Sequence, residues 1–299
     1  MSAAIPFGST SAETLAVLVE RHEDYRVLRR MRPMSRHGGP EARTAAALAG
    51  CALDVETTGL DHRRDAVIEL AMQRFRADAD GRIVDVGPPF RWLEDPGVPI
   101  SPEITALTGI DAVAVAGRRI CDAEAVCMLL DADFVIAHNA GFDRPFVERR
   151  LPDAAGRPWV CSMRDVDWRA RGFEGRVLSH LLSQMGWFYE AHRADADVNA
   201  LLHLLDHASD ATGGTVLAEA IGTAARPGWI VEAVRAPFET KDRLKARGYR
   251  WDAERRHWWR EVPFDGFDEE LEWSVVNVYG GRSRPRFRRI DWTSRYASA

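Results

Sequence analysis

Apolar and polar positions follow three different patterns along the chain. Over residues 11–31 apolar side chains recur at helical spacing, which predicts an amphipathic helix or two short ones. Residues 32–43 are rich in Pro, Gly and charge and read as a linker. From Ala47 the pattern changes to three apolar runs over residues 47–60, 65–78 and 81–95, separated by turns. These runs predict a β-meander.

Helices and strands then alternate. Ser101 and Pro102 are typical of a helix start, and Gly109 of a helix end. Residues 122–133 predict a second helix, residues 134–140 a buried strand with a turn, and residues 141–151 a third helix. A meander followed by this alternation predicts an α/β fold with a mixed sheet and flanking helices.

Composition sets outer limits on this fold. The chain has 299 residues, 46% of them hydrophobic, enough for one domain of roughly 150 to 200 residues plus a smaller module. No apolar run approaches the ~20 residues that span a bilayer, and the first residues lack a signal-peptide pattern, so we expect a cytoplasmic protein without a membrane partner. The four cysteines show no metal-site or disulfide spacing and are expected to be small buried residues.

Charge divides the chain unevenly. The net charge is −5, but residues 226–299 hold 16 Arg and Lys against 12 Asp and Glu, which leaves 24 against 33 for residues 1–225. An acidic body with a basic appendage favours a metal-dependent enzyme that acts on a phosphate polymer, because acids recruit metal and arginines recruit phosphate.

The first candidate site residues lie in a strand. Asp54 and Glu56, in the stretch CALDVETTGL, project from one face because side chains alternate along a strand. Two adjacent carboxylates repel unless a proton, a cation or water intervenes, so a divalent metal is one explanation. A half-exposed edge strand with both acids in solvent is the other.

Two later segments carry similar ambiguities. Asp143 opens the helix after the strand at 134–137, where a helix-capping acid is a sufficient explanation. Asp197 begins an apolar-faced helix, and His192 precedes it by five residues. The two side chains converge only if His192 lies on the loop before the helix, because one helix would place them about 140° apart. A surface histidine with Asp195 as N-cap is the alternative.

Together, D-x-E-T-T-G at 54–59, H-N-A-x-F-D at 138–143 and H-x-x-x-x-D at 192–197 resemble the DEDDh family of 3′–5′ exonucleases. That family includes the proofreading subunit of bacterial replicative polymerase, ribonuclease T and oligoribonuclease. The resemblance covers residues 47–207 and implies a ribonuclease H-like fold. It implies four acidic metal ligands and a catalytic histidine, which are Asp54, Glu56, Asp143, Asp197 and His192.

The implied chemistry is two-metal hydrolysis. Four carboxylates can hold two divalent ions about 3.5 to 4 Å apart, and oxygen ligands suit Mg²⁺ or Mn²⁺. His192 can accept a proton from the attacking water. The resemblance also places the backbone of Thr57 and Thr58 at the terminal 3′-OH. It places His138, Asn139 and Phe142 beside the last nucleotides.

The carboxyl-terminal region differs in composition. Six of the ten tryptophans lie beyond residue 225. Residues 241–247 predict a short helix capped by Thr240, and residues 249–252 and 257–262 predict strands joined by a turn, giving a small α+β module. Residues 279–296 interleave six arginines with aromatic residues, which suits single-stranded nucleic acid. The alternative is a tryptophan core with a solvated arginine tail.

We therefore expect an N-terminal helical extension over residues 1–46, an exonuclease domain over 47–210 and a nucleic-acid-binding module over 226–299. The expected activity is release of nucleoside 5′-monophosphates from 3′ ends. DNA with a single-stranded end or 3′ overhang, in repair or turnover, is favoured. An exoribonuclease and an inactive nucleic-acid-binding protein are the alternatives, and a homodimer stays open.

Overall fold

A computed structural model describes residues 11–39, 48–209 and 213–297. Its central sheet has the order β4-β3-β2-β5-β6. The strands are β2 Leu48–Thr57, β3 Val67–Ala77, β4 Ile83–Leu93, β5 Phe134–Ala137 and β6 Trp159–Cys161. The β2, β3 and β4 strands run antiparallel, while β5 and β6 run parallel to β2. The predicted meander and mixed sheet are confirmed.

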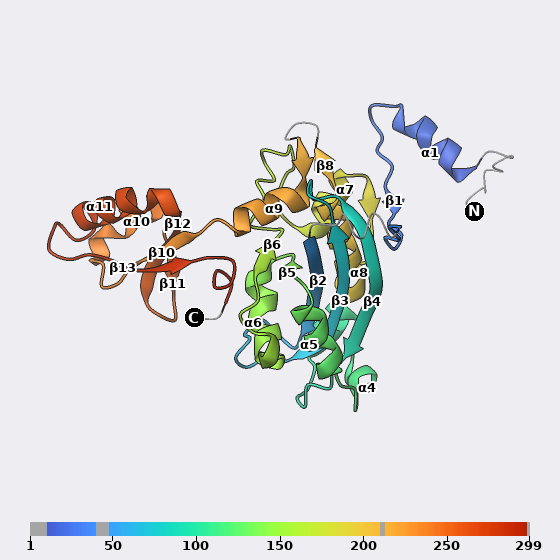
Figure 1. The fold of residues 1–299 in the computed structure, drawn as a ribbon, viewed down its shortest axis with the longest axis horizontal. Coiled ribbons are helices and arrows are strands. Elements are labelled where there is room, and N and C mark those ends of the chain that lie inside the picture. The colour runs from blue at the N-terminus through green and yellow to red at the C-terminus, as the bar shows by residue number, and fades with distance from the viewer. Residues whose placement is uncertain (1–10, 40–47, 210–212, 298–299) are drawn as a thin grey trace, which may run out of the picture.

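Helices cover both faces of this sheet (Figure 1). One face packs against α7 Leu178–Gln184, α8 Ala194–Leu205 and α9 Val216–Ala224. The other packs against α5 Asp122–Leu130 and α6 Ala140–Arg150. Strand β2 is buried between them, so Ala52 faces the first core and Leu53 the second. The α9 helix packs in the same core although it follows residue 210, where the sequence predicts the domain to end.

Several short elements complete this part of the chain. Helix α3 Pro102–Thr108 begins at Ser101, whose side chain accepts from the Ile104 N–H, and ends at Gly109 with φ 70°, as predicted. The remaining elements are α4 Ala112–Val115, η1 Pro152–Ala154, β7 Trp187–Phe188, β8 Ala208–Ser209 and β9 Gly214–Thr215. No helix in the described ranges is long and apolar enough to cross a membrane.

The amino-terminal segment differs from its prediction. Within residues 11–31 only α1 Ala12–Glu20 is helical, and the chain then extends to β1 Arg29–Arg30, which pairs with β7. Within the predicted linker, Met34 is buried in the sheet core and its N–H donates to Asn199 Oδ1 at 2.7 Å, while most of the other residues from 32 to 39 are exposed. Residues 40–43 of that linker, and Ala47, lie outside the described residues. Two cysteines also differ from expectation, since Cys121 and Cys127 are exposed.

A second sheet forms the carboxyl-terminal module (Figure 1). Its order is β11-β12-β10-β13, from β10 Gly228–Ala233, β11 Arg250–Asp252, β12 His257–Pro263 and β13 Arg286–Ile290. Helices α10 Lys241–Ala246 and α11 Phe267–Asn277 and turns η2 Phe238–Thr240 and η3 Phe264–Gly266 accompany it. The two predicted strands are confirmed as β11 and β12. Thr240 is not a side-chain cap, because its hydroxyl donates to the Pro237 carbonyl.

Residues 291–297 leave this module and return to the first sheet. The Trp159 N–H of edge strand β6 donates to the Trp292 carbonyl at 2.8 Å. Arg144, which is 1% exposed, donates to the Thr293 carbonyl at 2.6 Å, and Tyr296 Oη donates to Asp165 at 2.7 Å. Residues 291–297 are therefore part of the first sheet's packing, whereas the five arginines from 282 to 289 are exposed.

Candidate active site

Asp54 and Glu56 lie at the carboxyl end of β2, on the face toward α8. The parallel strand β5 pairs with β2 only from Gly50 to Ala52, so beyond Ala52 the β2 backbone is free on that side. This gap leaves the Val55 N–H without a strand partner. The end of the central strand is thus open to side chains from other elements.

Asp143 occupies the gap. The chain leaves β5, turns at Asn139 in the left-handed region with φ 79°, and starts α6. One carboxylate oxygen of Asp143 accepts from the Val55 N–H at 3.3 Å, and the residue is 2% exposed. Asp143 therefore binds the neighbouring strand and is not a cap of its own helix.

Asp197 reaches the same place from α8. Tyr189 Oη donates to it at 2.8 Å, and the Arg193 N–H donates at 3.1 Å. His192 lies on the preceding loop with φ 66° and an exposed ring, so the sequence-based expectation that it precedes the helix is confirmed. The N-cap position belongs to Arg193, which corrects the assignment of Asp195 as cap; Asp195 is exposed in the first turn.

Electrostatics make this cluster unstable as a set of bare anions. Burial, together with the charges of Asp143 and Asp197, raises the pKa of Asp54 well above its ordinary value. Burial and the charge of Asp197 raise the pKa of Glu56 to about 8. Burial also raises the pKa values of Asp143 and Asp197. A cation would relieve this penalty, because it favours the charged form of every carboxylate around it.

The donor set fits a hard divalent cation. Carboxylate oxygens of Asp54, Glu56 and Asp197 lie within 4.8 Å of one another. None of the cysteines belongs to this group, so the donors are oxygens, as Mg²⁺ and Mn²⁺ prefer. Asp143 lies beside these three residues, because its carboxylate accepts from the N–H of Val55, between Asp54 and Glu56 on β2. Its charge also raises the pKa of Asp54.

A cleft of about 390 Å³ joins these residues. Its lining includes the five residues above and Thr57, His138, Asn139 and Phe142. Thr58 is not in the lining: its hydroxyl accepts from the Ala66 N–H at 3.0 Å and bonds to Asp65 at 3.4 Å.

His138 is held on both ring nitrogens. Nδ1 bonds to Ser162 Oγ at 2.8 Å and Nε2 to the Arg176 carbonyl at 2.7 Å. Because a carbonyl only accepts, Nε2 carries the proton and Nδ1 accepts from the hydroxyl. Burial lowers the pKa of His138 to about 4, so the ring is neutral near pH 7 and is a fixed part of the cleft wall.

Two residues that sequence reasoning missed position this cleft. Tyr189 holds Asp197, and Glu69 of β3, fully buried and ion-paired with Arg91, accepts from the Ala194 N–H at 2.9 Å. Glu69 thus fixes the start of α8 against the sheet. Their only sequence signals were a polar residue in an apolar strand and a tyrosine three positions before His192.

The sheet order β4-β3-β2-β5-β6 becomes 3-2-1-4-5 when its strands are numbered from one along the chain. This order, with the first three strands antiparallel and acids at the end of the central strand, defines a ribonuclease H-like fold with a carboxylate-lined site. Within that class the chain belongs to the exonuclease family. The family model described as "Exonuclease" matches residues 51–205, and the family is that of the DEDDh 3′–5′ exonucleases. The resemblance drawn from the three motifs is confirmed.

Curated relatives match about half of this chain or less. "DNA polymerase III PolC-type" of Listeria welshimeri is 37% identical over 161 residues, which cover 52% of this chain and 11% of that protein. "3'-5' exonuclease DinG" of Bacillus subtilis is 32% identical over 153 residues, covering 48% of this chain and 16% of the relative. The chain thus spans less than a fifth of the length of these relatives.

Solved structures with a similar fold include Exonuclease X in complex with 5′ overhanging duplex DNA, with 23% identity and a TM-score of 0.41. That match covers 58% of this chain and 92% of the other. E. coli Exonuclease I in complex with a dT13 oligonucleotide has 17% identity and a TM-score of 0.46, with coverage of 53% and 40%.

Proposed function

We propose that this protein removes nucleotides one at a time from the 3′ end of DNA by hydrolysis and releases nucleoside 5′-monophosphates. The observation that carries the proposal is the convergence of Asp54, Glu56, Asp143, Asp197 and His192 on one cleft. They come from a strand, two helices and a loop in a member of the exonuclease family. A binding protein that had lost catalysis would not need to keep this strained carboxylate set.

Asp54, Glu56, Asp143 and Asp197 are proposed to hold two divalent cations, Mg²⁺ or Mn²⁺. When bound, such ions supply an activated water and stabilise the charge on the leaving 3′ oxygen. The chain's contribution is the orientation of the carboxylates. Tyr189 and the Arg193 N–H fix Asp197, and the Val55 N–H fixes Asp143.

His192 is proposed as the general base. Its ring is exposed and lines the cleft, on the loop before α8. His138 cannot take this role while both of its nitrogens are bonded, because protonating Nδ1 would break the bond from Ser162. The two histidines thus have separate roles, one for proton transfer and one for positioning.

The terminal nucleotide is proposed to lie against Thr57, His138, Asn139 and Phe142. Thr57 Oγ1 donates to the Gly59 carbonyl at 2.6 Å, which fixes the turn that lines the cleft where the 3′-OH is proposed to lie. Ile104, Leu107 and Phe142 add an apolar wall suited to a base or sugar face.

DNA is proposed as the substrate because the relatives include DNA polymerases. A role in repair or turnover is proposed with it. The test is digestion of end-labelled single-stranded, 3′-overhang and blunt DNA and matched RNA, with Mg²⁺ or Mn²⁺, with the Asp54→Asn variant as control. Mononucleotides released from DNA by the wild type alone are expected. Preference for RNA would indicate the exoribonuclease, and binding without hydrolysis would indicate the inactive binding protein.

A further inference from the structure

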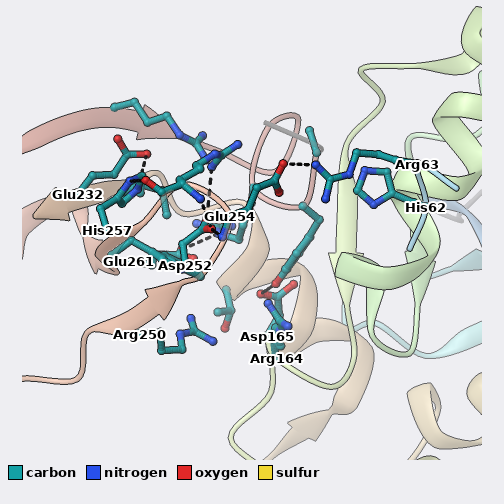
Figure 2. Close-up of a pocket in the computed structure, with 18 of the residues that line it drawn as sticks. His62, Arg63, Arg164, Asp165, Glu232, Arg250, Asp252, Glu254, His257 and Glu261 are labelled. Carbon is teal, nitrogen blue, oxygen red and sulfur yellow. Dashed lines mark hydrogen bonds and ion pairs between the residues drawn. The ribbon is translucent and has the colours of Figure 1, made fainter. Parts of the chain in front are cut away.

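A second cleft, of about 630 Å³, lies between the exonuclease part of the chain and the carboxyl-terminal module (Figure 2). His62, Arg63 and Arg164 border it from the first part, and Arg250, Glu254 and Arg288 from the module. Seven arginine and five acidic side chains line it, so positive charge is in excess.

The acidic side chains of this cleft already have partners. Glu254 is ion-paired with Arg63, and Glu261 pairs with Arg295 at 2.7 Å. Asp165 accepts from the Tyr296 hydroxyl at 2.7 Å and from the Cys161 N–H at 2.7 Å. These contacts join the module to the first sheet, so the two walls of the cleft are fixed relative to each other.

Four arginines in the lining form no ion pair within the described residues. They are Arg164, Arg176, Arg250 and Arg288. Arg250 lies with its guanidinium 4.4 Å from the centre of the Trp259 ring. Arg164 of the exonuclease part and Arg250 of the module lie on opposite walls of the cleft (Figure 2), and burial together with the charge of Arg164 lowers the pKa of Arg250. Facing like charges are stabilised by an anion between them.

This cleft adjoins the carboxylate cleft. Arg176 lines both of them, and its carbonyl is held by His138. Arg164 lies beside the first turn of α6, because a Cβ placed on Gly141 would be 3.6 Å from its Nη1. That turn also carries Phe142 and Asp143, which border the proposed terminal nucleotide. A chain of unpaired arginines therefore leads from the carboxylates to the module.

We propose that the single-stranded segment leading to the 3′ end passes Arg176 and runs between Arg164 and Arg250, whose guanidinium groups contact its phosphates. The cleft volume of about 630 Å³ is within the range of about 300–1,000 Å³ typical of clefts for small ligands, which is room for a short single-stranded segment. This inference rests on the proposed function, because that function places the 3′ end in the carboxylate cleft.

The test uses two double variants of the full chain with the same change of net charge. Arg164→Gln with Arg250→Gln alters the cleft, and Arg118→Gln with Arg169→Gln alters two exposed arginines outside it. Binding of a fluorescent 20-nucleotide strand, as DNA and as RNA, is measured by anisotropy in EDTA, where metal-dependent hydrolysis is blocked. Salt is varied, and thermal melting checks folding.

The cleft variant is expected to bind about 10-fold more weakly at low salt. Its slope of log affinity against log salt should fall by about 1.4, because each of the two phosphates left without an arginine partner accounts for about 0.7. Restoring a cation with Arg164→Lys and Arg250→Lys should recover most of the slope. Turnover of a dinucleotide with metal should not change. Weaker binding of only the DNA strand, or of only the RNA strand, supports the path and identifies which nucleic acid follows it.

Equal salt slopes for the two double variants would overturn the inference, as would an equal loss of binding to blunt duplex. The outcome is separable from that of the proposed function. Hydrolysis with equal slopes refutes the path alone. If the wild type hydrolyses nothing but the cleft variant still shows a selective loss of strand binding, the exonuclease proposal is refuted and the path is supported.

Discussion

Replacing Glu56 with glutamine should stabilise the metal-free protein, and by an amount that grows with pH. The pKa of Glu56 is raised from 4.5 to about 8 by burial and by Asp197. Between these two values the folded protein keeps a proton that the unfolded chain has released. Stability therefore falls as pH rises from about 4.5 to about 8, and glutamine, which has no such proton, removes this loss.

The magnitude follows from the pKa difference. At about 1.4 kcal/mol per unit, the full shift corresponds to an upper bound of about 5 kcal/mol above pH 8. Glu56 is partly accessible, and solvent screens part of its interaction with the other carboxylates. We therefore expect a gain of about 1 to 3 kcal/mol at pH 8 and close to zero at pH 4.5.

Urea unfolding in EDTA at pH 5, 6.5 and 8 measures this gain. His138, whose pKa is about 4, makes both proteins lose stability as pH falls below about 6.5. This contribution cancels in the difference in unfolding free energy between variant and wild type. Glu272→Gln, at an exposed position without an ion pair, is the matched control. With Mn²⁺ the stability difference should change sign, so that the wild type is the more stable protein, because the Glu56→Gln variant lacks one metal ligand. Equal stability of variant and wild type at pH 8 without metal would refute the reasoning.

Three further outcomes are expected. Asp54→Ala, Asp143→Ala or Asp197→Ala should abolish hydrolysis while the fold persists by circular dichroism, and near-normal turnover in any of them would contradict its role as ligand. His192→Ala should lower kcat about 10² to 10⁴-fold with little change in metal affinity by calorimetry, and a parallel loss of metal binding would make it a ligand. Arg144→Ala should cost about 3–5 kcal/mol in urea unfolding, because it removes the buried cation beside Glu148 and the donor to the Thr293 carbonyl, and a cost below 1 kcal/mol would contradict this.

The candidate site residues could be named from sequence because the resemblance to the DEDDh exonucleases joined three local motifs, each of which has another explanation by itself. The face shared by Asp54 and Glu56 follows from strand alternation, and Asp143 follows from a strand-to-helix junction. His192 required only that the helix begin after it. Each expectation concerns a few neighbouring residues, and the fold brings the three segments together through a sheet whose strands were themselves visible as apolar runs.

The misjudged features depend on contacts distant in sequence. Asp195 looks like an N-cap by position. The Ala194 N–H at this helix start, however, donates to Glu69, which lies 125 positions earlier in the chain. Residues 32–39 look like a linker by composition, yet Met34 is buried because Asn199 of α8 holds its backbone. Composition alone does not report a partner that lies across the fold.

The return of residues 291–297 changes how the carboxyl-terminal module has to be studied. Deleting residues 226–299 tests substrate contact if the module is a separate appendage, but Trp292 covers edge strand β6 and Tyr296 is buried against Asp165. Such a deletion would also remove the partners of Arg144, which follows the proposed ligand Asp143 on α6. A loss of activity after truncation would then report damage to the helix that carries a ligand. Substitution of exposed arginines leaves this packing in place, so it separates nucleic-acid contact from structural support.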